Sequence, residues 1–369
     1  MRTDFHYLDC NATAPLRPEA QSAMASAMAV SGNPSSVHGP GRAARAVIER
    51  AREQVAAMVG VPAAAVHFTA SGTEANNWAL ASSGRAPLAM ASSHDSVLRA
   101  VERAGGEILA VDGHGLLDPA ELGRAMDEAD LAIVSVVAVN NETGVIQPLA
   151  AIAEICRDRG ALLHIDAVQA PGRIDMTAIA SAGDLISLSA HKLGGPAGAG
   201  ALLVRERLDL DPLIVGGGQE KRRRAGTENL IGIAGFGAAA EAVAQEAGEA
   251  ARLATLRDRL ERRLSDVCEA AEIIGRSAER APNTTCVRMP GVPAETQLMA
   301  LDLAGVATSA GAACSSGKVQ PSHVLRAMGF DEEAAGEAIR ISTGWTTTEA
   351  DIDALLAAWE ALWRRKTAA

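Results

Sequence analysis

A lysine that follows a short apolar segment has the setting that points most directly to chemistry. Leu185–Ser189 has the pattern of a buried strand, and Lys192 lies between it and the Gly194-Gly195 pair that ends the segment. Burial at a strand end lowers the pKa of an amine, so that its neutral form can attack a carbonyl group. Considered alone, a lysine beside two glycines is as readily an ordinary solvated loop residue.

An aspartate in a matching position makes pyridoxal phosphate the cofactor that fits. Asp166 closes an earlier apolar strand, directly after His164 and Ile165. Pyridoxal phosphate requires such a pair, because a lysine forms a Schiff base with it and an aspartate pairs with its pyridinium nitrogen. Lys192 and Asp166 together favour a cofactor site over a solvated loop.

A phosphate site is the next feature to look for. The segment Ser71–Glu74, which contains Gly72 and Thr73, follows a strand and opens a helix. Backbone N–H groups at a helix start attract anions, and glycine lets a phosphate approach closely. The same residues also form an ordinary helix cap. The phosphate interpretation therefore depends on two further donors beside Lys192, which are Ser189 and His191.

Three more polar residues have settings that suit a binding site. Asn141 follows a long buried strand, where it can contact a cofactor oxygen or a substrate carboxylate, although Asn-rich turns are common. His94 lies at a strand-to-helix junction, where it can stack on a ring and move protons, or simply begin a helix. Arg340 alternates with apolar neighbours and needs a carboxylate partner, from either a substrate or a structural ion pair.

Cys314 lies in a loop of small residues, at 308–318, which is an unusual place for a structural cysteine. A tethered thiolate in such a loop can approach a substrate and withdraw, and Lys318 favours the thiolate form. A small residue in an ordinary loop is the alternative.

The composition is that of a globular protein of about two domains, with 369 residues and a net charge of −11. That charge argues against nucleic-acid and membrane partners, with the short basic run Lys221–Arg224 as a local exception. We expect no signal peptide, no membrane span and a cytoplasmic location. The five cysteines form no CxxC pair, so neither a disulfide framework nor a metal site is indicated.

The alternation of helix-like and strand-like segments between residues 40 and 205 predicts an α/β fold with a mostly parallel sheet. The expected helices are 43–59, 74–81, 95–104, 118–126 and 149–158, and the expected strands are 65–69, 88–91, 131–139, 161–165 and 185–189. A long Ala-rich helical stretch over 229–270 is expected to bridge to a smaller α+β part. That part has a strand at 284–289 and helices at 295–304, 321–328 and 349–363. We predict a large cofactor domain over 15–248, and a small domain from 1–14 and 249–369 that carries the cysteine loop at about 306–320.

Taken in order, these segments resemble the cysteine desulfurases of the NifS/IscS type, within the fold-type I, class V aminotransferase group of pyridoxal phosphate enzymes. The matching motifs are Tyr7–Pro15, Gly32–His38, Ser71–Glu74, Asn140–Gly144, His164–Gln169, Ser189–Lys192, Arg224–Asn229, Ala313–Gly317 and Pro321–Leu325. Each motif is weak alone, but their joint order is specific and spans nearly the whole chain.

The resemblance implies a role for each matched residue. Lys192 carries the cofactor, Asp166 holds its ring nitrogen, and His94 stacks on the ring and is a candidate for proton transfer. The ring oxygen is contacted by Gln169 and Asn141, and the phosphate is held by Gly72, Thr73, Ser189 and His191. Thr227 reaches the phosphate of a second subunit, which implies a homodimer. Asn33 and Arg340 bind the substrate carboxylate, and Cys314 accepts the sulfur.

The implied reaction converts L-cysteine to L-alanine and leaves a persulfide on Cys314, whose sulfur passes to an acceptor protein for iron–sulfur cluster or thio-cofactor synthesis. A selenocysteine lyase or another class V aminotransferase is the alternative, and an inactive binding subunit is a third. Two departures from the family pattern stand out. Lys221-Arg222 replaces a common Arg-Gly pair, and the chain ends soon after Trp363–Lys366, without a longer scaffold-docking tail.

Overall fold

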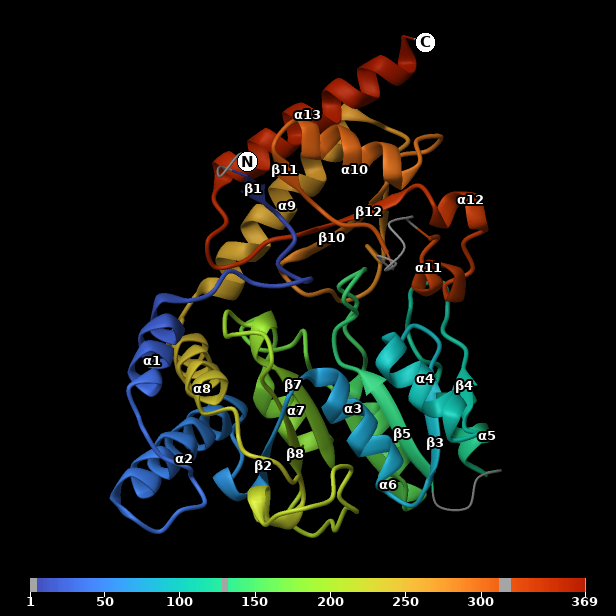
Figure 1. Ribbon diagram of the computed structural model, residues 1–369. Coiled ribbons are helices and arrows are strands. Elements are labelled where there is room, and N and C mark those ends of the chain that lie inside the picture. The colour runs from blue at the N-terminus through green and yellow to red at the C-terminus, as the bar shows by residue number, and fades with distance from the viewer. Residues whose placement is uncertain (1–4, 128–131, 312–319, 369) are drawn as a thin grey trace.

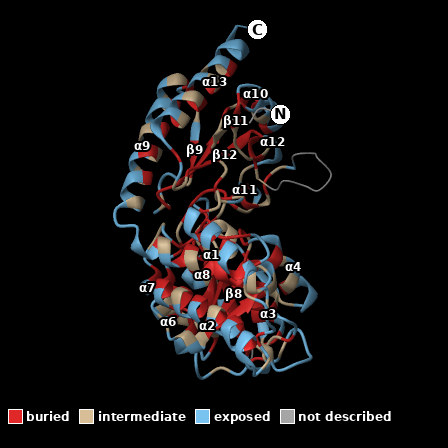
Figure 2. Ribbon diagram, turned by 60° about the vertical axis from the view of Figure 1, so that its left-hand side comes forward, coloured by how far each residue is buried: buried red, intermediate tan, exposed pale blue. Residues whose placement is uncertain are grey.

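The computed structural model describes residues 5–127, 132–311 and 320–368. A large sheet flanked by helices forms the lower part of Figure 1, and a smaller α/β part that holds both chain ends lies above it. Figure 2 shows that the strands are buried while the outer faces of the helices are exposed.

The large sheet has seven strands in the order β2-β8-β7-β6-β5-β3-β4. Their bounds are Val66–Thr69 for β2, Ala86–Met90 for β3, Glu107–Leu109 for β4, Ala132–Val137 for β5, Leu162–Asp166 for β6, Leu185–Ser189 for β7 and Gly200–Val204 for β8. All neighbours from β7 through β4 run parallel, whereas β8 runs antiparallel to both β7 and β2. The mostly parallel sheet is therefore confirmed. β8 reverses because its connection from β7 is too short for a crossover.

Successive residues of the central strands enter two different cores, which explains why these strands are continuously apolar. Ile133, Leu185 and Leu202 pack into the core beneath α3 and α4. Their neighbours Val134 and Ile186 enter the core on the opposite face. Side chains alternate across a strand, so a sheet that is covered on both faces needs apolar residues at every position.

The helices of the lower part divide between these two faces. α3 (Gly72–Ala81) and α4 (Asp95–Arg103) cover one face. The other core is closed by helices that include α2 (Gly39–Val59), α6 (Leu149–Asp158) and α8 (Leu230–Gln245). The remaining helices here are α1 (Pro18–Met28), α5 (Pro119–Asp127) and α7 (Met176–Ala182). α8 packs along both α1 and α2.

The upper part has a three-stranded antiparallel sheet in the order β12-β10-β9, and a parallel pair of β1 with β11. These strands are β1 (His6–Tyr7), β9 (Glu272–Ile274), β10 (Thr284–Arg288), β11 (Val306–Ala307) and β12 (Ala338–Ser342). The helices are α9 (Glu249–Val267), α10 (Ala294–Leu303), α11 (His323–Ala327), α12 (Glu332–Ala335) and α13 (Glu349–Thr367). Leu8 shares one core with α9 and α13, so the N-terminal segment packs with the C-terminal third of the chain.

The helical stretch predicted over 229–270 is two helices. α8 ends at Gln245 and α9 begins at Glu249, and Gly248 between them has φ 84°. Glu246 caps the end of α8, and Gly248 is the N-cap of α9, where glycine adopts the left-handed conformation without steric cost. The chain therefore changes direction at this point, which separates the helix of the lower part from that of the upper part (Figure 1). Among the described residues, no helix is long and apolar enough to cross a membrane.

Candidate active site

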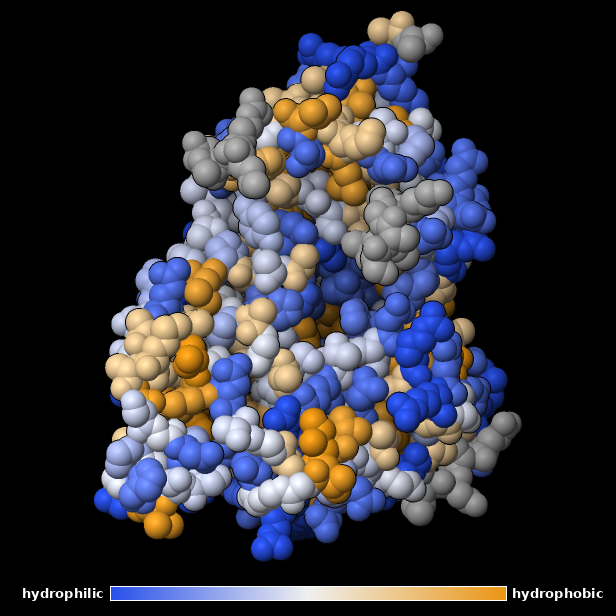
Figure 3. Space-filling model, viewed as in Figure 1, coloured by the Kyte–Doolittle hydropathy of each residue, from blue (hydrophilic) through white to orange (hydrophobic). Residues whose placement is uncertain are grey.

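A cavity of about 410 Å³ lies at the carboxyl ends of β6 and β7, beneath the upper part. Figure 3 shows the surface hollowed between the two parts, with hydrophilic side chains around the hollow. Most of the predicted site residues line this cavity: Gly72, Thr73, His94, Asn141, Asp166, Gln169, Ser189, His191, Lys192 and Arg340. Ligands of α/β sheets bind at this edge, because the strand ends bring separate loops together.

Lys192 ends a single 3-10 turn that directly follows β7. Its Nζ donates hydrogen bonds to the backbone oxygens of Asn11, at 2.7 Å, and Ala12, at 2.8 Å. Burial, with the nearby cations Arg340 and Arg173, lowers the pKa of Lys192 to about 8. The amine can therefore exist in its neutral, nucleophilic form near physiological pH.

Asp166 ends β6 and is only 5% exposed. Its Oδ2 accepts a hydrogen bond from Asn76 Nδ2 at 2.8 Å, and its Oδ1 accepts one from the backbone N–H of Val168 at 3.1 Å. These two donors hold a buried carboxylate in one orientation at the cavity wall. A carboxylate so placed can pair with a ring nitrogen that carries a proton.

The start of α3 and the end of β7 form a cradle for an anion. Ser71 caps the helix by accepting a hydrogen bond from Glu74 N at 3.1 Å. A Cβ added to Gly72 would lie 2.8 Å from Val168 Cγ2 and 3.4 Å from Ser189 Cβ, so only glycine leaves this approach open. The cradle combines helix N–H groups with side-chain donors, and these fit a phosphate.

His191 completes the cradle as a neutral ring. Its Nδ1 lies 2.9 Å from Thr13 Oγ1. Burial, and to a lesser degree the charge of Lys192, lowers the pKa of His191 to about 4. It therefore offers the cavity a hydrogen bond without a positive charge of its own.

Gln169 and Asn141 are held by partners that the sequence patterns do not single out. Gln169 Nε2 donates to Asn11 O at 2.9 Å, and its Oε1 accepts from the guanidinium of Arg173. The backbone oxygen of Asn141 accepts from Asn11 Nδ2 at 3.0 Å and from Arg340 Nη1 at 3.3 Å. Gln169 is thus held by its side chain and Asn141 by its backbone, and both line the cavity.

Arg340 lies on β12 and reaches the cavity from above. Its Nη2 donates to Asp9 Oδ1 at 2.7 Å, so the structural ion pair considered for this residue is present. Its Nε is buried and has no hydrogen-bond partner in the described part of the chain. A buried donor without a partner is costly, so the guanidinium has capacity left for a substrate carboxylate.

Three predicted site residues are not placed at this cavity. Asn33 is exposed, and its Oδ1 accepts a hydrogen bond from Ser35 N at 2.8 Å. Thr227 is also exposed and lines a separate cavity with Glu220 and Arg224. Cys314 lies outside the described residues. The roles of all three therefore stay predictions.

The departure at Lys221-Arg222 has a structural counterpart in the loop before Thr227. Glu220, Lys221 and Arg222 all have positive φ, at 45°, 59° and 69°. The Glu220 carboxylate anchors this unusual backbone, because it accepts two hydrogen bonds from Arg52 at 2.8 Å. The contacts of Glu220 thus hold a loop in which three successive long side chains have positive φ.

Asn11, Asn76 and Ser96 also line the cavity, although no sequence pattern predicts them as site residues. Asn11 is 1% exposed and joins the two parts of the molecule, because its Nδ2 also donates to Thr284 Oγ1 at 2.9 Å. Asn76 is 2% exposed on α3, but its sequence neighbours Ala75 and Asn77 do not distinguish it from an exposed helix position.

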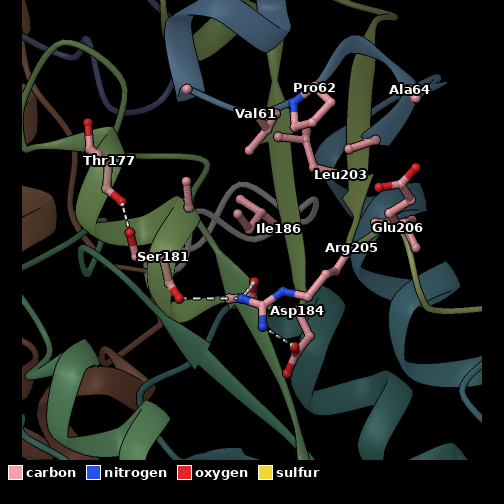
Figure 4. Close-up of a pocket in the computed structure, with 15 residues that line it drawn as sticks. Val61, Pro62, Ala64, Thr177, Ser181, Asp184, Ile186, Leu203, Arg205 and Glu206 are labelled. Atoms are coloured by element: carbon pink, nitrogen blue, oxygen red, sulfur yellow. Dashed lines mark hydrogen bonds and ion pairs between the residues drawn. The ribbon is translucent and has the colours of Figure 1, made fainter.

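A second cavity, of about 360 Å³, lies at the opposite ends of β7 and β8 (Figure 4). Ile186 and Leu203 from those strands lie against its wall. Arg205 pairs with Asp184 at 3.1 Å and donates to Ser181 O at 3.3 Å, so these groups satisfy one another. An apolar hollow in which Arg205 and Asp184 already pair is a weaker candidate for chemistry than the first cavity.

The fold and the first cavity define a class of enzyme. A strand-end lysine with a lowered pKa, an opposed carboxylate and an anion cradle suit a flat, phosphorylated cofactor that carries an aldehyde, as pyridoxal phosphate does. Among the described residues, no group of three or more His, Cys, Asp or Glu side chains is placed to hold a metal ion.

Comparison with known proteins agrees with this class. Residues 6–355 match the model of the family Aminotransferase class-V. The chain belongs to this family of pyridoxal phosphate-dependent enzymes, as the resemblance in its motifs predicts. It is 43% identical to a cysteine desulfurase of Cereibacter sphaeroides, over 95% of this chain and 93% of the relative. It is 40% identical to the cysteine desulfurase IscS of Dictyoglomus turgidum, over 94% and 91%.

A solved structure extends the likeness to three dimensions. The NifS-like protein from Rickettsia africae superposes with a TM-score of 0.92 and is 34% identical in sequence. The comparison covers 98% of this chain and all of that one (100%). Both parts of the fold are therefore shared with that protein.

Proposed function

We propose that the protein is a pyridoxal phosphate-dependent cysteine desulfurase that converts L-cysteine to L-alanine and transfers the sulfur to Cys314. The observation that carries this proposal is the convergence of Lys192, Asp166 and Arg340 on one cavity, beside an anion cradle. Relatives that are named cysteine desulfurases, and that align over 94% or more of this chain, support it.

Four groups hold the cofactor in this proposal. Lys192 binds its aldehyde carbon, Asp166 faces its ring nitrogen, and Ser189 and the start of α3 at Gly72 receive its phosphate. When bound, pyridoxal phosphate supplies an electron-accepting ring that stabilises the charge left on the substrate's α-carbon after proton removal.

Lys192 is the base that removes this α-proton. The backbone oxygens of Asn11 and Ala12 give the released amino group a fixed place, 2.7 Å and 2.8 Å from Nζ. Its lowered pKa, about 8, leaves a useful fraction of the amine free of its own proton at neutral pH. Arg340 holds the substrate carboxylate, which orients the α-carbon toward that amine.

Sulfur transfer follows by attack of the Cys314 thiolate on the substrate sulfur. An S–S bond forms as the substrate C–S bond breaks, and the bonding electrons stay with the carbon fragment, which takes up protons and leaves as alanine. Ser309 and Gly311, at the near end of the predicted cysteine loop, line the cavity. In the proposed reaction, the cysteine loop therefore begins next to the bound substrate.

The proposal includes a homodimer, in which Thr227 reaches the partner's phosphate site and Asn33 assists in carboxylate binding. Both residues are exposed in the single chain, so a second chain can contact them.

We also propose the division into domains at 15–248 and at 1–14 with 249–369, a sulfur-acceptor protein and a cytoplasmic location. Free thiols at Cys10, Cys156, Cys268 and Cys286 suit a reducing compartment.

The test is product analysis with a matched lysine variant. The purified protein loaded with pyridoxal phosphate should release alanine from L-cysteine and show a visible absorption band from the bound cofactor. Lys192→Ala should lose both, whereas Lys366→Ala, at the far end of α13, should keep both. An unchanged absorption band in Lys192→Ala would show that another residue binds the cofactor.

A further inference from the structure

A chain of hydrogen bonds links Asp166 to His94 through two residues outside the predicted site. Asn76 Nδ2 donates to Asp166 Oδ2 at 2.8 Å and to Ser96 Oγ at 2.9 Å. Ser96 Oγ lies 2.8 Å from His94 Nδ1, and the backbone N–H of Ser96 donates to the same nitrogen at 3.0 Å. All four side chains line the cavity.

The direction of every bond in this chain follows from the carboxylate. An ionised carboxylate accepts only, so the amide group that faces Asp166 must be the NH₂ group of Asn76. The second N–H of that group donates a hydrogen bond to Ser96 Oγ. The Ser96 hydroxyl proton is then left for His94 Nδ1, the acceptor 2.8 Å away.

A backbone hydrogen bond indicates independently that His94 Nδ1 carries no proton. A peptide N–H can only donate, so the bond from Ser96 N requires His94 Nδ1 to be without a proton. The ring proton of a neutral histidine then lies on Nε2. Within the described part of the chain, His94 Nε2 has no hydrogen-bond partner, and His94 is exposed where it lines the cavity.

This arrangement has a cost, which argues that the orientation matters. Asn76 is 2% exposed, and its Oδ1 is buried without a partner among the described residues. Turning the amide around would not help, because it would place that oxygen against the Asp166 carboxylate. Buried acceptors without a partner are rare because they cost free energy. The presence of one here indicates that the NH₂ end of the same amide is needed.

We propose that Asn76 and Ser96 are positioning residues that hold His94 in the tautomer with its proton on Nε2, so that His94 faces the cavity as a hydrogen-bond donor and not as a base. The role of His94 in the reaction rests on the proposed function. With Nε2 occupied and Nδ1 engaged by Ser96, the imidazole has no site for a substrate proton, and proton removal is left to Lys192.

The direct test is nitrogen NMR of the full-length protein with ¹⁵N-labelled histidine, in cofactor-free and cofactor-loaded forms. The His94 signals are identified by their loss in His94→Gln. In both forms, the expected result is a ring proton on Nε2 and none on Nδ1. A proton on Nδ1, or a doubly protonated ring, would overturn the proposal.

Variants test whether Asn76 and Ser96 are responsible. Ser96→Ala keeps the backbone N–H but loses the hydroxyl, and one neutral hydrogen bond corresponds to a shift of roughly 2- to 10-fold toward the Nδ1–H tautomer. Ser96→Thr restores the hydroxyl and should restore the ratio. Asn76→Leu should shift the ratio as Ser96→Ala does, and should weaken cofactor binding by roughly 10- to 100-fold, because Asp166 loses a donor.

Asn77→Leu is the matched control. This neighbour also lies on α3, but its Nδ2 donates to the backbone oxygens of Thr73, at 2.9 Å, and Ser96, at 3.2 Å. It should leave the tautomer ratio unchanged. If Ser96→Ala and Asn76→Leu also leave the ratio unchanged, the positioning role is wrong. The NMR result in the cofactor-free protein does not depend on the substrate, so failure of the desulfurase assay alone would refute the function and not this network.

Discussion

Replacing Lys192 with methionine is expected to stabilise the cofactor-free protein at neutral pH, by an amount that falls as the pH rises. Burial, followed by the charges of Arg340 and Arg173, lowers the pKa of this amine from 10.5 to about 8. In the unfolded chain the ordinary pKa returns, so between these two values the unfolded state binds more protons. The free energy of unfolding of the wild type therefore rises with pH in that window.

The magnitude follows from the size of the shift. One pKa unit corresponds to about 1.4 kcal/mol, so the protonated amine costs the folded state about 3 kcal/mol below pH 8. The variant also loses the hydrogen bonds from Nζ to Asn11 O and Ala12 O. Those bonds can form with the charged or the neutral amine, so their loss offsets the gain by an amount that depends little on pH.

The diagnostic quantity is thus the change with pH of the difference in unfolding free energy. Urea unfolding of wild type and Lys192→Met, both without cofactor, should show this difference falling by about 2 to 3 kcal/mol between pH 7 and pH 10. Other titrating groups are common to both proteins and cancel. A difference that stays constant, or that grows with pH, would refute a buried amine with a lowered pKa.

Three further predictions concern the neighbours of this amine and the loop before Thr227. Arg340→Gln should raise KM for L-cysteine by roughly 10- to 100-fold with a smaller effect on kcat, since a charge-assisted contact to the carboxylate is lost. Gly72→Ala should weaken cofactor binding by about 1 to 3 kcal/mol in a fluorescence titration, because its Cβ would lie 2.8 Å from Val168 Cγ2. Glu220→Ala should lower the free energy of unfolding by about 1 to 3 kcal/mol, because the buried guanidinium of Arg52 keeps Glu49 at 3.1 Å but loses its two hydrogen bonds to Glu220.

Each of these has a control or a contradicting outcome. Arg288→Gln removes an arginine of the same small sheet, paired with Glu337 at 2.8 Å, and should leave KM unchanged. Gly60→Ala has open space around its Cβ and a φ of 82°, so it should cost stability without affecting cofactor binding. A Glu220→Ala protein as stable as the wild type would mean that the pair with Glu49 alone satisfies Arg52.

The sequence predicted best those elements whose burial leaves a continuous pattern. Leu185–Ser189 and Leu149–Asp158 begin and end at the predicted residues, because one is covered on both faces and the other has a single apolar stripe. The strand Gly200–Val204 was not predicted, nor was its reversed direction, which is decided by the short connection after Lys192. The break at Gly248 was missed because the Ala-rich composition continues across it.

For the site, residue types at strand ends were sufficient to predict Lys192 and Asp166, and the structure brings both to one cavity. Asn76 and Ser96 could not be predicted, because their importance depends on distances between side chains from different elements. Asn33 and Thr227 are exposed in the single chain, and the roles proposed for them require a second chain.

Transfer of the substrate sulfur to Cys314 can be followed in a single turnover. The cofactor-loaded protein is mixed with one equivalent of L-cysteine, alkylated and analysed by peptide mass spectrometry. We predict one extra sulfur atom on the peptide that contains Cys314, none on the peptide with the buried Cys156, and an equal amount of alanine. Alanine formed without extra sulfur on Cys314, or formed at the wild-type rate by Cys314→Ala, would contradict the proposed reaction.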